Sequence, residues 1–280
     1  MESVNEVVRG ILDNVEVQAP RRDNEFLASD GLLHCAECGD AVQCRIMIFG
    51  QQKVVRCICS CVAAEMKAEE DRRRADLVES NRRTCFEGSD MIGWKFAADD
   101  EKDLKLSNAM RRYVASFDEF KRNGKGLLLY GRNGTGKTFY ACCIANALID
   151  EGFQCLVTNF ARLSNQLSAV KDKQGFIDSL SSFSLLVLDD LGAERQSEYM
   201  QEQVFNIVNA RYCSGLPFIV TTNLTIEEIT KPQDMGRARI YNRILERCYP
   251  ISVNAFDRRK AQLKNDFPTM GAKLGLSGLF

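Results

Sequence analysis

The sequence has no excess of charge of either sign. Its 280 residues include 37 lysines and arginines against 38 aspartates and glutamates, so the formal net charge is −1. Without an overall basic field, any contact with nucleic acid must use local patches. The length allows one large domain together with a small one.

Long apolar runs are also missing. The sequence contains no stretch of about eighteen apolar residues that could span a bilayer. The first fourteen residues include acids and have no apolar core of signal-peptide length. Internal repeats and low-complexity tracts are not found. We therefore expect a cytoplasmic protein with no membrane partner.

A glycine-rich loop at Gly131–Thr138 reads G-x-x-x-x-G-K-T, after the apolar run Gly126–Tyr130 and before an apolar helix over 139–149. Such a loop points backbone N–H groups at a phosphate chain, Lys137 reaches the β- and γ-phosphates, and Thr138 holds Mg²⁺. A glycine turn that binds nothing is the alternative, but the strand before and the helix after favour a nucleotide site. The residues expected to contact ATP are Gly131, Arg132, Asn133, Gly134, Thr135, Gly136, Lys137, Thr138 and Phe139.

Two acids, Asp189 and Asp190, end the apolar strand that begins at Ser184, and Asn223 ends the next strand. We expect Asp189 to help Thr138 hold Mg²⁺ and Asp190 to orient or deprotonate the attacking water. Asn223 would reach the water or the γ-phosphate, although a strand end of this kind is also a common capping element. Carboxyl ends of parallel strands meet at one edge, so these residues and Lys137 form the predicted catalytic set.

Arginines follow these motifs. Arg239, Arg243 and Arg247 are spaced i, i+4, i+8 and share one helical face. A solvated face is the ordinary interpretation, but in an oligomeric ATPase one of them can reach the γ-phosphate of a neighbouring subunit. Further on, Arg258 or Arg259 could touch the nucleotide of its own subunit; a basic surface turn is the alternative.

Cysteines are concentrated near the N-terminus. Cys35-x-x-Cys38-Gly is typical of a metal-binding knuckle, and a Cys-x-Cys-x-Cys group follows at hairpin distance. A structural Zn²⁺ is expected on four of five thiolates, with the first four favoured: Cys35, Cys38, Cys57, Cys59 and Cys61. Cys44 and the single histidine, His34, are substitutes. An iron–sulfur cluster, which takes the same four thiolates, is the alternative.

We divide the chain into a cysteine-rich module over 1–62, a charged helical linker over 63–100 and an ATPase domain over 101–280. In the last, strands alternate with amphipathic helices, which indicates an α/β fold with a parallel sheet and helices on both faces. The linker is read as a solvated helix, or alternatively as one whose arginines, Arg72–Arg74 and Arg82–Arg83, touch nucleic acid or a partner.

In this order, the motifs resemble those of the AAA+ ATPases. Within that class, the chain looks like the bacterial replicative-helicase loaders and transposition helpers (the DnaC/DnaI/IstB group), some of which also carry an N-terminal cysteine-rich module. The stretches that carry the resemblance are Leu128–Thr138, Leu185–Gly192, Ile219–Asn223 and Arg239–Arg243.

The resemblance implies roles for single residues. Lys137 and Thr138 match the Walker A pair, Asp189 and Asp190 the Walker B acids, although many AAA+ proteins have Glu at the second position. Asn223 matches sensor 1. The implied arginines are Arg243 as the finger acting on a neighbour, with Arg239 second, and Arg258 or Arg259 as sensor 2.

As a whole, the resemblance implies a slow, partner-regulated ATPase that self-associates, holds the replicative helicase and places it on single-stranded DNA. The cysteine-rich module would grip the helicase. A transposition helper or phage-encoded ATPase that assembles on DNA is the alternative. A small-molecule kinase is a third possibility, against which Asn223 and the arginine-rich helix argue.

Overall fold

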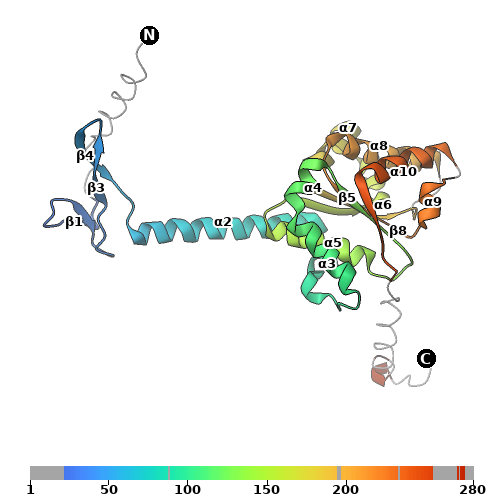
Figure 1. Cartoon of the computed structure of the whole chain (residues 1–280), viewed down its shortest axis with the longest axis horizontal. Helices are drawn as coiled ribbons and strands as arrows, with labels where there is room; N and C mark the ends of the chain where they lie inside the picture. Colours follow the sequence, from blue (N-terminus) through green and yellow to red (C-terminus); the bar gives the residue numbers. More distant parts are fainter. Residues whose placement is uncertain are drawn as a thin grey trace, which may run out of the picture. The chain divides into compact units, whose positions relative to one another are not determined.

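The structure is a computed structural model that describes residues 22–87, 89–193, 197–232, 234–254, 270 and 272–274 (Figure 1). The chain divides into two compact units, Met1–Asp76 and Leu77–Phe280. Residues 77–100, assigned above to a separate linker, cluster with the larger unit. The reason is apolar packing, because several of their side chains lie against its core: Val78, Cys85, Phe86, Met91, Ile92, Trp94 and Phe96.

The smaller unit consists of two short antiparallel sheets. Strand β1 (Glu25–Leu27) pairs with β2 (Leu33–Cys35), and β3 (Gln43–Ile48) pairs with β4 (Gln51–Arg56). Among the described residues, the apolar cluster of this unit has three buried side chains, those of Cys35, Val42 and Cys59. Isolated hairpins with so little buried surface are marginal in water, so this unit needs another source of stability.

Helix α2 (Ser60–Phe86) follows β4 and is highly charged. Its buried residues, Cys85 and Phe86, are at its C-terminal end. Over the preceding turns, the side chains are mostly exposed and paired along the helix, as in the contact between Arg73 and Glu69. The predicted solvated helix is therefore present over most of this segment. No helix among the described residues is long and apolar enough to cross a membrane.

The larger unit is built on one parallel sheet with the strand order β6-β7-β8-β5-β9. Its strands are β5 (Gly126–Tyr130), β6 (Cys155–Asn159), β7 (Leu185–Leu191), β8 (Phe218–Thr222) and β9 (Cys248–Ser252). The central strand β8 is buried along its whole length, which explains its continuous run of apolar and threonine side chains. The predicted α/β fold is confirmed.

Helices cover both faces of the sheet, and each face has its own apolar core. One face carries α3 (Leu104–Ala115), α4 (Phe117–Asn123) and α5 (Lys137–Asp150). The other carries α6 (Phe160–Ala169), α7 (Lys173–Ser179), α8 (Glu198–Ser214), α9 (Ile226–Thr230) and α10 (Met235–Arg247). Figure 1 shows α5 running along the sheet directly after β5. This order places the phosphate loop between a buried strand and a buried helix.

Candidate nucleotide site and candidate metal site

Three adjacent strands bring the predicted nucleotide residues together. The sheet order places β5 next to β8 and β8 next to β7. The phosphate loop follows β5, Asn223 follows β8, and Asp189 and Asp190 lie near the end of β7. Because all three strands are parallel, their carboxyl ends share one edge of the sheet.

The loop conformation depends on glycine. Gly131 and Gly136 have φ angles of 143° and 102°, which residues with a side chain rarely adopt. At Gly131, an added Cβ would also lie 2.5 Å from the backbone oxygen of Val253. The loop can therefore turn only with glycine at this position, and it delivers Lys137 as the first residue of α5.

The side chain of Lys137 is folded onto the loop. Its side chain is almost fully buried, and Nζ donates hydrogen bonds to Gly131 O at 2.9 Å and Arg132 O at 2.8 Å. A third bond goes to Asn223 Oδ1 at 2.7 Å. These three acceptors are neutral oxygens. A phosphate chain would compete with them for the Lys137 ammonium, because hydrogen bonds between two charged groups are stronger.

Thr138 and Asp189 form the pair that fits a magnesium ion. The Thr138 hydroxyl donates to Asp189 Oδ1 at 2.9 Å. Two oxygens at adjacent positions of an octahedral Mg²⁺ site lie about 3 Å apart, since each is about 2.1 Å from the ion. The oxygen chemistry and the spacing both fit the ion, so these two residues would hold it.

Burial raises the pKa of the Asp189 carboxyl, and the neighbouring Asp190 acts in the same direction. Hydrogen bonds from the hydroxyls of Thr221 and Thr138 lower the pKa of Asp189 and oppose this effect. A cation bound here would favour the ionised carboxylate further, because an opposite charge at short range stabilises it. The surroundings of Asp189 therefore suit a carboxylate that binds a metal cation.

Thr221 was not singled out from the sequence, yet it forms hydrogen bonds with both acidic residues. Its hydroxyl donates to Asp189 Oδ1 at 2.5 Å and accepts the backbone N–H of Asp190 at 3.0 Å. The Thr221 side chain is fully buried in the central strand. The signal in the sequence was a polar residue inside an apolar strand, two positions before Asn223.

Asp190 has an unusual backbone conformation. Its φ angle is 57°, in the left-handed region, and the pairing of β7 with β8 is irregular between Leu188 and Leu191. Such strain in a residue other than glycine persists only where its surroundings enforce it, often at functional sites. The irregularity leaves Asp190 exposed at the edge of the sheet, next to half-buried Asp189.

The structure separates the two candidate finger arginines. The Arg243 guanidinium donates to Asn209 Oδ1 at 2.8 Å and lies 4.6 Å from the centre of the Phe205 ring, both on α8. Arg239 is exposed, and within the described residues its guanidinium has no hydrogen bond or ion pair. The preference for Arg243 thus conflicts with its packing inside the subunit. Arg258 and Arg259 lie outside the described residues.

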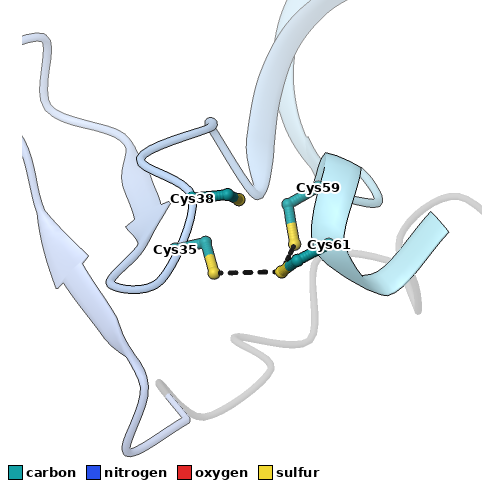
Figure 2. Close-up of side chains that lie close together, drawn as sticks. All are labelled: Cys35, Cys38, Cys59 and Cys61. Atoms are coloured by element: carbon teal, nitrogen blue, oxygen red, sulfur yellow. Dashed lines mark hydrogen bonds between the residues drawn. The ribbon is translucent and has the colours of Figure 1, made fainter. Parts of the chain in front are cut away.

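In the smaller unit, four cysteine sulfurs lie together, with every pair within 4.8 Å: Cys35, Cys38, Cys59 and Cys61 (Figure 2). The Sγ atoms of Cys59 and Cys61 are 3.2 Å apart, and those of Cys35 and Cys61 are 3.6 Å apart. In a tetrahedral Zn²⁺ site with bonds of about 2.3 Å, thiolate sulfurs are about 3.8 Å apart. Both the donor set and the spacing fit zinc.

Cys57 does not belong to this group, which corrects the set favoured from the sequence. Its thiol donates to Ala41 O at 3.2 Å instead. The physical reason is that α2 starts at Ser60, so the first turn of the helix brings Cys61 back toward Cys59. His34 bonds Asp30 and Gly39 O, and Cys44 is not in the group.

The surroundings of Cys38 favour its thiolate. Hydrogen bonds involving the backbone of Asp40 and then of Cys61 lower the pKa of Cys38 to about 6. Metals bind thiolates rather than thiols, so a backbone that stabilises a thiolate favours metal binding. The cluster is therefore chemically suited to a structural metal.

Comparisons with known proteins agree with this geometry. The family described as IstB-like ATP binding protein matches residues 61–265. The replicative helicase loader DnaI of Bacillus subtilis (strain 168) is 25% identical over 209 residues, which are 69% of this chain and 66% of that protein. The replicative helicase loader DnaC of Escherichia coli (strain K12) is 31% identical over 153 residues, 51% of this chain and 60% of that protein.

Among solved structures, a crystal structure of DnaI matches with a TM-score of 0.50 and 29% identity, over 59% of this chain and 90% of that chain. The matched segment spans less than two thirds of the full length of both curated loaders. The fold and the phosphate loop define the larger unit as an AAA+ ATPase domain. The chain belongs to the IstB-like ATP binding protein family and is homologous to the replicative helicase loaders.

Proposed function

We propose that this protein is an ATP-dependent loader of the replicative DNA helicase, acting in DNA replication. One observation carries the ATPase part of the proposal: Lys137, Thr138 and Asp189 meet Asn223 at the shared edge of three parallel strands, linked by short hydrogen bonds. That is the arrangement by which a P-loop ATPase couples nucleotide binding to chemistry. Homology to two replicative helicase loaders is the reason for proposing a replicative helicase as the partner.

In this proposal, bound ATP supplies the phosphoanhydride that water cleaves, and Mg²⁺ neutralises the charge that develops. The loop N–H groups and Lys137 bind the phosphates, while Thr138 and Asp189 hold the ion. Asp190 orients the attacking water or accepts its proton. Asn223 leaves Lys137 and positions the water.

A neighbouring subunit completes the site. Arg239 is the better candidate for this role, since its guanidinium is exposed and uncommitted, whereas Arg243 is held by α8. An arginine inserted from a partner stabilises charge on the transferred phosphoryl group and can raise turnover by about three orders of magnitude. Self-association would therefore switch on hydrolysis.

The cysteine cluster is proposed to bind one Zn²⁺ through Cys35, Cys38, Cys59 and Cys61 and so to fold the smaller unit. That unit would grip the helicase, and the ATPase domain would contact single-stranded DNA. Exposed apolar side chains on the smaller unit, such as Met47 and Phe49, support a protein-binding role. Site and partners together suit a cytoplasmic replication factor.

A transposition helper or phage-encoded ATPase that assembles on DNA is the second candidate. The observation that favours it is the family match, because the family is described as IstB-like. Such a helper would use the same nucleotide site but a transposase or DNA as its partner. The nucleotide geometry therefore does not separate the two candidates, and partner binding must.

The test is a pull-down of purified replicative helicase with the full chain, with and without ATP. The loader proposal predicts a nucleotide-sensitive complex. A Cys35→Ser variant, which removes one metal ligand, is expected to lose the complex while the ATPase domain still binds ATP. Failure to bind helicase, together with filaments on duplex DNA, would instead identify the transposition-type helper.

A further inference from the structure

A groove of about 820 Å³ opens beside β9, the edge strand of the parallel sheet. Its walls are α3 on one side and β9 with the end of α10 on the other. The residues of β5 that line it, Gly126 and Leu127, are at the opposite end of that strand from the phosphate loop. The groove is thus separate from the nucleotide site.

The floor of the groove is apolar. It includes Tyr113, Leu127 and Ile251, which belong to the core on this face of the sheet, together with Leu245. Cavities of this size accept several bulky apolar groups. An occupant must therefore offer apolar side chains to fill it.

The rim of the groove is basic. Lys105, Arg112, Lys125 and Arg247 stand around it, against one acid, Glu246. The Glu246 carboxylate already accepts the Tyr212 hydroxyl at 2.6 Å. Lys125 Nζ donates to Glu246 O and Arg247 Nη2 to Tyr212 O. Among the described residues that line it, the rim therefore has four cations against one carboxylate.

Neither Lys105 nor Arg112 makes a side-chain hydrogen bond or ion pair within the described part of the chain. They lie seven residues apart on α3, hence on one face and about 10 Å apart along the helix axis. Ala109 lies between them and also lines the groove, so its small side chain leaves the space between the charges open.

The outer edge of β9 is poorly suited to the addition of a further strand. Val253 N–H donates to Tyr130 O on β5, and the N–H groups of a strand alternate between its two edges. Pro250, which has no N–H, therefore faces the outer edge, where a further strand would need a donor. An occupant must be held by its side chains.

We propose that this groove docks an acidic segment of a partner protein, whose bulky apolar side chains fill the floor and whose carboxylates meet Lys105 and Arg112. Charge argues against the chain's own residues 255–280, which carry five lysines and arginines and two aspartates. The mainly aliphatic floor favours a protein segment over nucleic acid, which binds through polar contacts to its base edges and by stacking on open aromatic faces. The proposal concerns a surface beyond the nucleotide site and does not depend on which partner the ATPase loads.

The test is a peptide-display selection on the intact, ATP-binding chain, followed by fluorescence anisotropy with the selected peptide. The comparison variant is Lys105→Glu with Arg112→Glu. The control is Arg72→Glu with Arg74→Glu on exposed α2, which changes the charge equally away from the groove. An Ala109→Trp variant fills the groove without changing its charge. Unchanged ATP binding shows that each variant is folded.

We expect wild type and the α2 control to enrich the same peptides, with Asp or Glu beside Leu, Ile, Phe or Trp. Charge reversal on α3 and Ala109→Trp should each weaken binding by about tenfold or more, and added salt should weaken it in wild type. Three outcomes would overturn the proposal: no enrichment over the reversed variant, equal affinity of the variants, or enrichment of basic or purely polar peptides. Competition by single-stranded DNA at the same residues would assign the groove to nucleic acid instead.

Discussion

The Lys137 ammonium donates a hydrogen bond to Asn223 Oδ1 at 2.7 Å, so the residue expected to bind phosphate and the residue expected to sense it are directly joined. A phosphate chain that binds Lys137 would compete with this bond and with the bonds to the loop carbonyls of Gly131 and Arg132. The freed Asn223 amide can then turn to the water or the γ-phosphate. The contact links nucleotide binding to the end of β8.

Substitution of these two residues is expected to have different effects. Lys137→Ala should abolish ATP binding, because the phosphates lose their cation. Asn223→Ala should keep ATP binding but lower turnover by about 100-fold, as for loss of one donor at a developing charge. Fluorescent-nucleotide titration and steady-state phosphate release measure the two effects. Equal loss of binding in both variants would contradict a separate role for Asn223.

Thr221 should set the pH dependence of turnover. Its hydroxyl donates to the Asp189 carboxylate, which lowers the pKa of that carboxyl, so Thr221→Val should raise it. A higher pKa means that Asp189 ionises only at higher pH, and the acidic limb of the pH–rate profile should move upward. Turnover should fall by about tenfold or more, as for a lost hydrogen bond to a charged group.

Thr221→Ser keeps the hydroxyl and is the matched control, expected to restore both the rate and the pH profile. A profile identical in Thr221→Val and wild type would show that Thr221 only packs.

Substitution of Arg239 and of Arg243 on α10 should have different effects, the first on turnover in the assembly and the second on stability. Arg239→Ala should leave ATP binding and the melting temperature unchanged but lower turnover of the assembled protein by about 1,000-fold. Arg243→Ala should instead destabilise the fold by about 1–2 kcal/mol, because Arg243 loses Asn209 and the Phe205 ring. Thermal unfolding and protein-dependent ATPase titrations measure both. The reverse pattern would restore Arg243 as the finger.

Zinc content tests the cysteine group. Elemental analysis should find one zinc per chain in wild type and in Cys57→Ser, and a large loss in Cys61→Ser, because Cys57 bonds Ala41 O outside the cluster. The thiolates must form for binding, so zinc should be released as the pH falls. Retention of zinc in Cys61→Ser with loss in Cys57→Ser would contradict the structure. Iron in place of zinc would assign a cluster instead.

The sequence predicted the sheet, and the meeting of Lys137, Asp189 and Asn223 at one of its edges, because the signals are local. A loop such as Gly131–Thr138 and an apolar strand ending in Asp189 are each contained in one short segment. The choice between Cys57 and Cys61 was not local, since it depends on where α2 starts. The choice between Arg239 and Arg243 depends on α8, some 30 residues away, because both arginines share one face of α10.

Thr221 was missed for a related reason. A threonine in a buried strand fits β structure well, and only the neighbouring strand shows that its hydroxyl has the two acids as partners. The groove beside β9 was equally hidden, because Lys105 and Arg112 look like an ordinary solvated helix face until the apolar floor is in view.

The most direct test of the central proposal is ATP-dependent loading of the replicative helicase onto circular single-stranded DNA, measured as unwinding of an annealed strand. The proposal predicts that the wild-type chain promotes unwinding and that Lys137→Ala does not, although Lys137→Ala keeps its zinc and its fold. Unwinding that is no greater with the wild-type chain than without it, under conditions where the chain binds ATP, would contradict the loader function.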